Sequence, residues 1–176
     1  MKYFTGDWFA DNYIMTDILS QVDYYSGTER KKILKTPKGT GSMLYGVTWR
    51  GYLSEIFSEF GTLYFPDFKY LQVQMNYNYG IGKHTDSKNV GESVLCCFGD
   101  YTGGETMVDY GKGTVLSYDA RQEPVRFNGS KYEHWVAPYK GNRYSLVFFN
   151  NIKRKLILRL DSIIDSQTKS IQKKLT

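Results

Sequence analysis

The chain has 176 residues, of which 41% are hydrophobic, 16% aromatic and 23% charged. This size and balance predict one globular domain with a hydrophobic core, and they exclude a disordered or low-complexity chain. The formal net charge is +5 and the pI is about 9.0, which fits a polyanionic partner but equally an ordinary solvated basic surface.

The adjacent cysteines Cys96 and Cys97 lie in an apolar run, where a strand would point their side chains to opposite faces. They are poorly placed to pair, so neither a disulfide framework nor a cysteine-based zinc site is expected. The first residues do not resemble a signal peptide, and no apolar run approaches the length of a membrane span. We expect a soluble intracellular protein, in the cytoplasm or in a nucleus or host cell, without a membrane partner.

The chain divides by pattern into three parts of a single domain. Residues 1–68 read as a mixed α/β support with a substrate loop, residues 69–160 as a β core, and residues 161–176 as a tail or amphipathic helix. In the first part, apolar residues at helical spacing predict a helix over residues 51–60. Residues 26–42 are polar and contain glycine, which predicts a loop whose basic side chains either contact phosphates or simply face solvent. These basic residues are Arg30, Lys31, Lys32, Lys35 and Lys38.

The β core is predicted as a series of short strands separated by glycine-rich turns. The predicted strands are residues 71–77, Ser93–Phe98, Glu105–Tyr110, Thr114–Tyr118, Pro124–Phe127, Arg143–Phe149 and Leu156–Leu160. Short strands at such regular spacing are typical of a β sandwich or a barrel-like roll. We therefore expect a mainly β fold with flanking helices.

The only two histidines of the chain and one aspartate form a candidate metal site. His84 and Asp86 are two residues apart, so on a strand their side chains point to the same side. His134 lies much later in the chain, and a β roll can bring it beside this pair. Two imidazoles and one carboxylate on one face of an octahedron leave three positions open, which is the ligand set of non-haem iron(II) oxygenases. We therefore interpret His84, Asp86 and His134 as ligands of Fe(II).

A candidate anion site follows His134 in the chain. Arg143 and Ser145 share a face of a predicted strand. A guanidinium matches a carboxylate in bidentate fashion, and a hydroxyl two residues later can add a third hydrogen bond. The pair suits the far carboxylate of 2-oxoglutarate, whose keto-acid end would chelate the iron.

Each of these signals is weak when it is taken alone. A single histidine is more often structural than a ligand, and a single arginine is more often part of a surface ion pair. The conjunction of H-x-D, a distant histidine and R-x-S in one β region favours the catalytic interpretation.

The segment from Asn76 to Asn150 resembles the double-stranded β-helix (jelly-roll, cupin-like) core of the Fe(II)/2-oxoglutarate dioxygenases. Three motifs carry the resemblance: H-x-D-x-x-N over residues 84–89, G-D-x-x-G-G-E over residues 99–105, and H-x-x-x-P-x-x-x-x-R-Y-S-L-V-F-F over residues 134–149. Together they look most like the TET/JBP branch, whose members oxidise the 5-methyl group of pyrimidines in nucleic acid. The resemblance implies Fe(II), 2-oxoglutarate and dioxygen as cofactor and co-substrates, and DNA containing 5-methylcytosine or thymine as the partner.

The resemblance also implies roles for individual residues. Asn89 falls where the branch places an asparagine that hydrogen-bonds the flipped base, and Phe149 falls where it places a stacking ring. From the residues alone, Asn89 would be a turn residue and Phe149 a core residue. Asn151 stands where the animal 5-methylcytosine enzymes have histidine, which leaves the base open, because an amide and an imidazole read a pyrimidine edge differently. Further candidates are Asn76 and Asn78, near the co-substrate residues of AlkB-like relatives, and the basic residues Arg30, Lys31 and Lys32 for substrate.

Two alternatives remain open on these residues. The same core serves AlkB-like demethylation of nucleic acid and prolyl or lysyl hydroxylation of proteins, because a fold does not determine a substrate. A non-catalytic β-roll module that binds nucleic acid is the alternative from another class. Such a module has no need to keep the complete set of metal and co-substrate residues.

Overall fold

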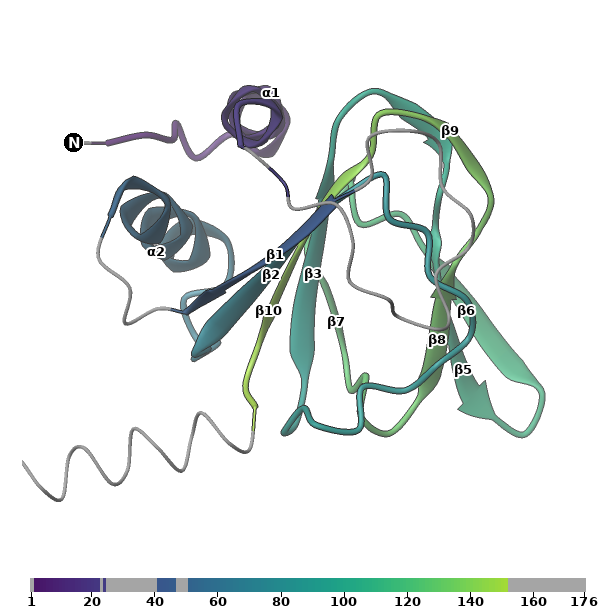
Figure 1. Cartoon of the computed structure of the whole chain (residues 1–176). Helices are drawn as coiled ribbons and strands as arrows, with labels where there is room; N and C mark the ends of the chain where they lie inside the picture. Colours follow the sequence, from purple (N-terminus) through teal and green to yellow (C-terminus); the bar gives the residue numbers. More distant parts are fainter. Residues whose placement is uncertain (1, 23, 25–40, 47–50, 152–176) are drawn as a thin grey trace, which may run out of the picture.

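The computed structural model describes residues 2–22, 24, 41–46 and 51–151, and for residues 41–46 it describes the backbone alone. Two helices in this part of the chain, α1 (Trp8–Ser20) and α2 (Tyr52–Tyr64), lie together on one side of a roll of antiparallel strands (Figure 1). The helices therefore cover one face of the roll and leave its interior to the strands.

The strands form three sheets, and the two larger ones lie on opposite sides of the roll (Figure 1). The five-stranded sheet has the order β1 (Gly41–Gly46), β2 (Gln72–Tyr77), β10 (Tyr144–Phe149), β3 (Ser93–Phe98) and β7 (Val125–Phe127). The three-stranded sheet has the order β6 (Thr114–Tyr118), β5 (Thr106–Gly111) and β8 (Glu133–Val136), and β4 (Tyr101–Gly103) pairs with β9 (Tyr139–Gly141). This architecture confirms the prediction of a mainly β fold with flanking helices.

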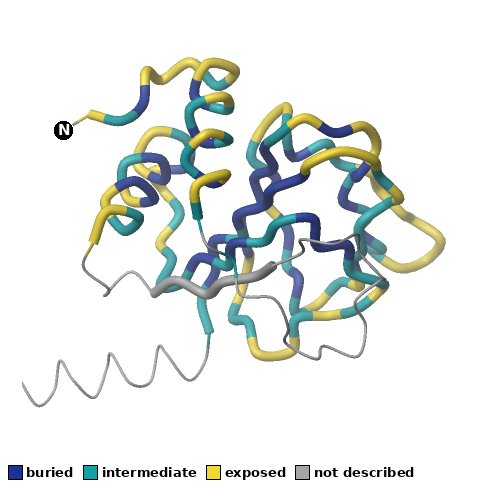
Figure 2. The backbone as a smooth tube through the Cα atoms, turned by 45° about the horizontal axis from the view of Figure 1, so that its top comes forward, coloured by how far each residue is buried: buried dark blue, intermediate teal, exposed yellow. Residues whose placement is uncertain are grey.

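Side chains alternate between two environments along the three central strands of the five-stranded sheet, because successive residues of a strand point to opposite faces. The set that packs toward the helices is Val73 and Met75 on β2, Val94, Cys96 and Phe98 on β3, and Tyr144, Leu146 and Phe148 on β10. Leu95, Cys97 and Val147 belong to a second cluster inside the roll. Figure 2 shows the resulting buried stretches along these strands. As predicted, Cys96 and Cys97 face opposite ways, and both are free thiols.

Helix α2 covers the five-stranded sheet with an apolar stripe. Ile56, Phe57 and Phe60 are 0%, 2% and 0% exposed, and they recur at helical spacing along one side of the helix. The ring of Phe60 stacks on that of Phe148, with centroids 6.3 Å apart. The predicted helix over residues 51–60 is confirmed, and it continues to Tyr64.

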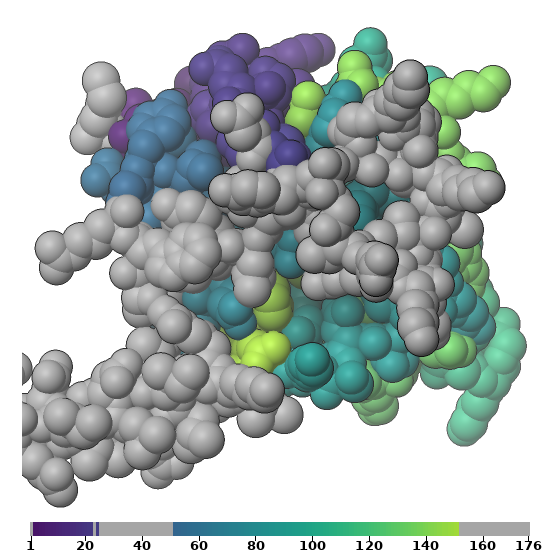
Figure 3. All heavy atoms as spheres, viewed as in Figure 1, coloured from purple at the N-terminus to yellow at the C-terminus, as the bar shows by residue number. Residues whose placement is uncertain are grey.

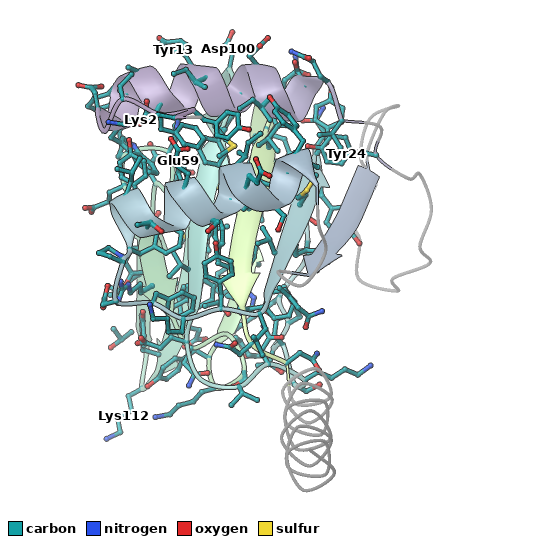
Figure 4. The ribbon with its side chains drawn as sticks, turned by 90° about the vertical axis from the view of Figure 1, so that its left-hand side faces the viewer. Lys2, Tyr13, Tyr24, Glu59, Asp100 and Lys112 are labelled. Atoms are coloured by element: carbon teal, nitrogen blue, oxygen red, sulfur yellow. The ribbon has the colours of Figure 1, made fainter. Side chains whose placement is uncertain are left out.

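Helix α1 lies beside α2, as the space-filling view shows (Figure 3), and it was not among the predicted elements. Met15 and Leu19 are completely buried in the cluster under the helices. The indole of Trp8 donates a hydrogen bond to the carbonyl of Arg121 over 2.8 Å. Tyr13 points outward from the helix into solvent (Figure 4) and is 80% exposed. Apolar residues at helical spacing and a hydrogen bond to a distant part of the chain therefore hold this helix.

Most predicted strands are confirmed with small shifts at their ends. Ser93–Phe98 and Thr114–Tyr118 coincide with β3 and β6, whereas Arg143 precedes β10. The sequence reading missed β1, which falls partly in the predicted loop, and it missed β4, β8 and β9, which have only 3, 4 and 3 residues. The predicted strand Leu156–Leu160, the tail and most of the predicted loop lie outside the described residues. No helix in the described part of the chain is long and apolar enough to cross a membrane.

Candidate metal centre and adjoining pocket

The structure brings His84, Asp86 and His134 together. One candidate ligand atom from each residue lies within 4.8 Å of the other two. Nε2 of His84 is 3.5 Å from one carboxylate oxygen of Asp86, and Nε2 of His134 is 3.6 Å from the other. The two imidazoles and the carboxylate therefore converge on one point.

Backbone pairing places the two histidines side by side. His84, in the loop after β2, forms an isolated antiparallel bridge with His134 on β8. The amide N–H of each residue donates to the carbonyl of the other, over 3.1 Å and 2.9 Å. The N–H of Asp86 donates to the carbonyl of Gly129 over 2.8 Å. A Cβ on Gly129 would lie 3.2 Å from both the Asp86 carboxylate and the His134 ring, so a larger residue here would press on these two side chains.

Neighbouring carbonyls orient both imidazoles. Nδ1 of His84 lies 2.8 Å from the carbonyl of Gly82, and Nδ1 of His134 lies 3.1 Å from that of Tyr132. A carbonyl only accepts hydrogen bonds, so Nδ1 carries the proton and the lone pair of Nε2 faces the aspartate. Burial lowers the pKa of His134, which favours the neutral imidazole that binds a metal.

The donor set fits iron(II). Two neutral imidazole nitrogens and one carboxylate oxygen are the ligands expected for a non-haem Fe(II) site with open positions. Among the described residues, no other histidine, cysteine, aspartate or glutamate lies close enough to be a fourth ligand beside His84, Asp86 and His134. Three ligands leave coordination positions of the metal open for one bidentate ligand and one further small ligand.

A pocket of about 580 Å³ adjoins the three residues, and Arg143, Ser145, Asn76, Asn89, Phe149 and Asn151 also line it. This volume is within the usual range for a small-molecule site. The pocket lies between the inner faces of the two larger sheets. The structure thus places most of the residues singled out from the sequence around one cavity.

Arg143 is buried without an acidic partner. Its side chain is 2% exposed, and within the described chain no carboxylate pairs with it. Nε donates to the carbonyl of Gly104 over 3.2 Å, and Nη2 approaches Sγ of Cys97 at 3.1 Å. Burial raises the pKa of the Cys97 thiol, so that thiol is uncharged and does not neutralise the arginine. A buried, unneutralised guanidinium that lines a cavity is a site for an anion.

The aromatic rings of Tyr101 and Tyr139 lie over the guanidinium, with centroids 5.7 Å and 5.8 Å from its central carbon. These rings stabilise the cation and leave its pocket side to a ligand. Gly104 is close enough that a Cβ there would meet the Arg143 side chain at 3.1 Å. The G-G turn is thus needed for the close packing of the arginine.

Asn76 and Asn78 have different environments. Nδ2 of Asn76 donates to Oγ of Ser145 over 3.1 Å, across the β2–β10 pair, and both residues line the pocket. Asn78 has a φ of 47° and accepts the N–H of Arg143 over 2.8 Å. It is not among the pocket residues. Its side chain therefore holds the backbone that carries Arg143.

The three residues predicted to contact a base lie at one end of the pocket. Asn89 and Asn151 pair in an isolated bridge, and Phe149 is two residues before Asn151. Nδ2 of Asn89 donates to Oδ2 of Asp86 over 3.2 Å, so the amide of Asn89 orients the candidate metal ligand. The basic residues Arg30, Lys31 and Lys32 lie outside the described residues.

The sequence reading did not single out several residues of the pocket wall. Gln72 and Gln74 line it from β2, Thr106 from β5, and Tyr79 from the loop after β2. A signal was present for the first two, because Gln72, Gln74 and Asn76 alternate with apolar residues along one predicted strand. A row of three amides on one face of a strand in a β core was a sign of a polar cavity.

Comparison with solved structures shows which fold this is. A prolyl-4-hydroxylase from Pseudomonas putida has a TM-score of 0.56 and 12% identity, over 85% of this chain and 89% of its own. OsALKBH1 has a TM-score of 0.56 and 13% identity, over 84% and 94%. NgTET1 in complex with 5mC DNA has a TM-score of 0.53 and 17% identity, over 83% and 69%. The fold is that of the Fe(II)/2-oxoglutarate oxygenases.

The predicted double-stranded β-helix core is thereby confirmed. The three similar structures bear the names of a prolyl-4-hydroxylase, an ALKBH protein and a TET protein, so the fold alone does not favour one branch of these enzymes. No protein-family model matches the sequence. A search of curated proteins also found no match.

Proposed function

We propose that the protein is an Fe(II)- and 2-oxoglutarate-dependent dioxygenase. The observation that carries the proposal is that Arg143, buried without a carboxylate partner, lines the same pocket as His84, Asp86 and His134. A metal site alone fits many proteins, and so does a buried arginine. The small dianion 2-oxoglutarate would use both sites at once, its keto-acid end at the metal and its distant carboxylate at the arginine.

In this proposal His84, Asp86 and His134 hold the iron, which supplies the oxidising chemistry when 2-oxoglutarate and dioxygen are bound. Arg143 and Ser145 bind the distal carboxylate of 2-oxoglutarate. Asn76 donates to Ser145 and keeps its hydroxyl oriented toward the pocket. The protein supplies the positions of the ligands and a partly buried cavity, in which each hydrogen bond to the co-substrate is stronger than it would be in water.

For the substrate, we propose the 5-methyl group of a pyrimidine in DNA, 5-methylcytosine or thymine. Reaction on a base requires a pocket that accepts the base outside the stack, with a ring to stack on and polar groups to read its edge. Phe149 lines the pocket and can provide the ring, while Gln72, Asn89 and Asn151 provide amides. AlkB-like demethylation and prolyl or lysyl hydroxylation are the alternatives on the same core.

Two measurements test these proposals in turn. Anaerobic addition of Fe(II) and 2-oxoglutarate should produce the weak visible charge-transfer band of the chelate, and its absence would favour a non-catalytic nucleic-acid-binding module. Mass spectrometry of nucleosides, after incubation with methylated and unmethylated DNA, should then reveal a hydroxymethylated base. A methylated base restored to its unmodified form would favour the AlkB-like activity. A gain of one oxygen on a protein substrate, without a modified base, would favour the protein hydroxylase.

A further inference from the structure

The inner wall of the pocket is a ladder of three cross-strand pairs between β2 and β10. The pairs are Asn76 with Ser145, Gln74 with Val147, and Gln72 with Phe149. All six residues line the pocket. Because directly opposite residues of an antiparallel pair share a face, each β2 amide lies next to its β10 partner.

The ladder has a co-substrate end and a far end. Ser145 is two residues after Arg143, so the first pair lies at the candidate anion site. Gln74 donates to the carbonyl of Met75 over 3.2 Å and to the side-chain oxygen of Asn76 over 3.4 Å. The amides nearest Arg143 thus form hydrogen bonds within the protein.

Gln72 differs from the other two amides of the ladder. Its side-chain oxygen, Oε1, is buried and has no hydrogen-bond partner among the described residues. A buried acceptor without a donor is costly, and native structures satisfy nearly all such groups. Gln72 is the cross-strand partner of Phe149, and both residues line the pocket, so this amide belongs to the part of the wall that carries the ring on which a base is proposed to stack.

We propose that Gln72 is a specificity-determining residue, whose side-chain oxygen accepts a hydrogen bond from the exocyclic amine of 5-methylcytosine. This inference rests on the proposed function. The two candidate bases differ at the ring position next to the methyl group, where 5-methylcytosine has an amine and thymine has a carbonyl oxygen. An acceptor oxygen at the wall beside the base satisfies the amine and repels the carbonyl. The pocket therefore prefers 5-methylcytosine to thymine.

The test compares kcat/KM for two oligonucleotides that differ only in carrying 5-methylcytosine or thymine at one position. Wild-type protein should prefer the 5-methylcytosine oligonucleotide at least about tenfold, the discrimination of one good hydrogen bond to a base. Gln72→Leu should reduce this preference to nearly none. Gln72→Glu keeps an acceptor and should keep the preference.

Gln74→Leu is the matched control, because it removes the same amide from the same face of the same strand. Its base preference should equal that of the wild type, even where its rate falls. Thermal unfolding, and succinate formed from 2-oxoglutarate without DNA, show that each variant is folded and holds iron.

The outcomes separate the inference from the proposed function. If wild-type protein oxidises the 5-methylcytosine oligonucleotide and Gln72→Leu retains the full preference, the role of Gln72 is wrong while the proposed function stands. A wild-type preference for thymine would also overturn the inference alone. If the wild type forms succinate but oxidises neither oligonucleotide, the nucleobase proposal and the inference both fail.

Discussion

The imidazole rings of His84 and His134 lie side by side at one edge of the three-stranded sheet, with centroids 4.2 Å apart and ring planes tilted by 51°. The two residues are partners in a single backbone bridge, so their spacing is set by two main-chain hydrogen bonds rather than by flexible side chains. Asp86 joins them because it is two residues after His84. Pre-positioned ligands of this kind reduce the conformational entropy that metal binding must overcome.

We expect that replacing either His84 or Asp86 with alanine abolishes both iron binding and succinate formation. Each change removes one of the three proposed ligands found among the described residues. Iron content after anaerobic loading and succinate by mass spectrometry measure the two effects. Asp67→Ala is a suitable control, since Asp67 is an exposed partner of Arg126 and is not part of the pocket. Turnover that survives loss of His84 or Asp86 would show that the metal assignment is wrong.

Replacing Arg143 with leucine should raise the KM for 2-oxoglutarate about a hundredfold or more, because loss of a charge-assisted bidentate contact costs about 3 kcal/mol. In the absence of ligand, the same variant should unfold at a temperature no lower than that of the wild type, since it removes an unneutralised buried charge. Thermal unfolding with and without 2-oxoglutarate and iron distinguishes the two effects. Added 2-oxoglutarate should stabilise the wild type and not the variant. If both proteins were stabilised equally, Arg143 would not be the co-substrate ligand.

Replacing Asn89 with alanine should weaken Fe(II) binding about 10- to 100-fold in the absence of DNA, because the side-chain amide of Asn89 donates to the carboxylate of Asp86. Iron titration of the apoprotein measures this directly. The proposed function also gives Asn89 a contact with the base, which is the role that the resemblance to the TET/JBP branch implies. Unchanged iron affinity, with a raised KM for the oligonucleotide only, would support that role and exclude the positioning role.

Asp11 should stabilise the fold at neutral pH and lose this contribution in acid. The carboxylate is completely buried and accepts hydrogen bonds from the N–H and hydroxyl of Thr5, the N–H of Gly6 and the hydroxyl of Tyr64. Burial raises the pKa of Asp11, but the hydrogen bonds from Tyr64, Thr5 and Gly6 outweigh it and leave the pKa below its usual value.

A carboxyl whose pKa is lowered by folding stabilises the protein above its unfolded pKa of about 3.9, and the stabilisation disappears as the pH falls through the folded pKa. Asp11→Asn should therefore lower the free energy of unfolding at pH 7 by about 1–3 kcal/mol. The difference from the wild type should shrink in acid. Urea unfolding at several pH values measures it, with the exposed Asp17→Asn as the control. A destabilisation of the same size at every pH would contradict the role of the carboxylate charge.

Local pattern in the sequence determined several of the strands and the chemical identity of the candidate site. A short run of apolar and β-branched residues bounded by turn residues is a property of a few neighbouring residues, so β3 and β6 are predicted to the residue. The opposite orientation of Cys96 and Cys97 is also a local property, because neighbouring residues of a strand point to opposite faces. The chemistry of His84, Asp86 and His134 can likewise be read from their side chains, without knowing where they lie.

Only the tertiary structure decided which of these residues meet and which remain without a partner. The His84–His134 bridge and the β2–β10 register join segments far apart in the chain, and no local pattern specifies such pairing. Whether the charge of Arg143 is neutralised, and whether the oxygen of Gln72 has a donor, depends on every group packed around them. Burial and hydrogen bonding are properties of that surrounding shell, and the shell exists only after the chain has folded.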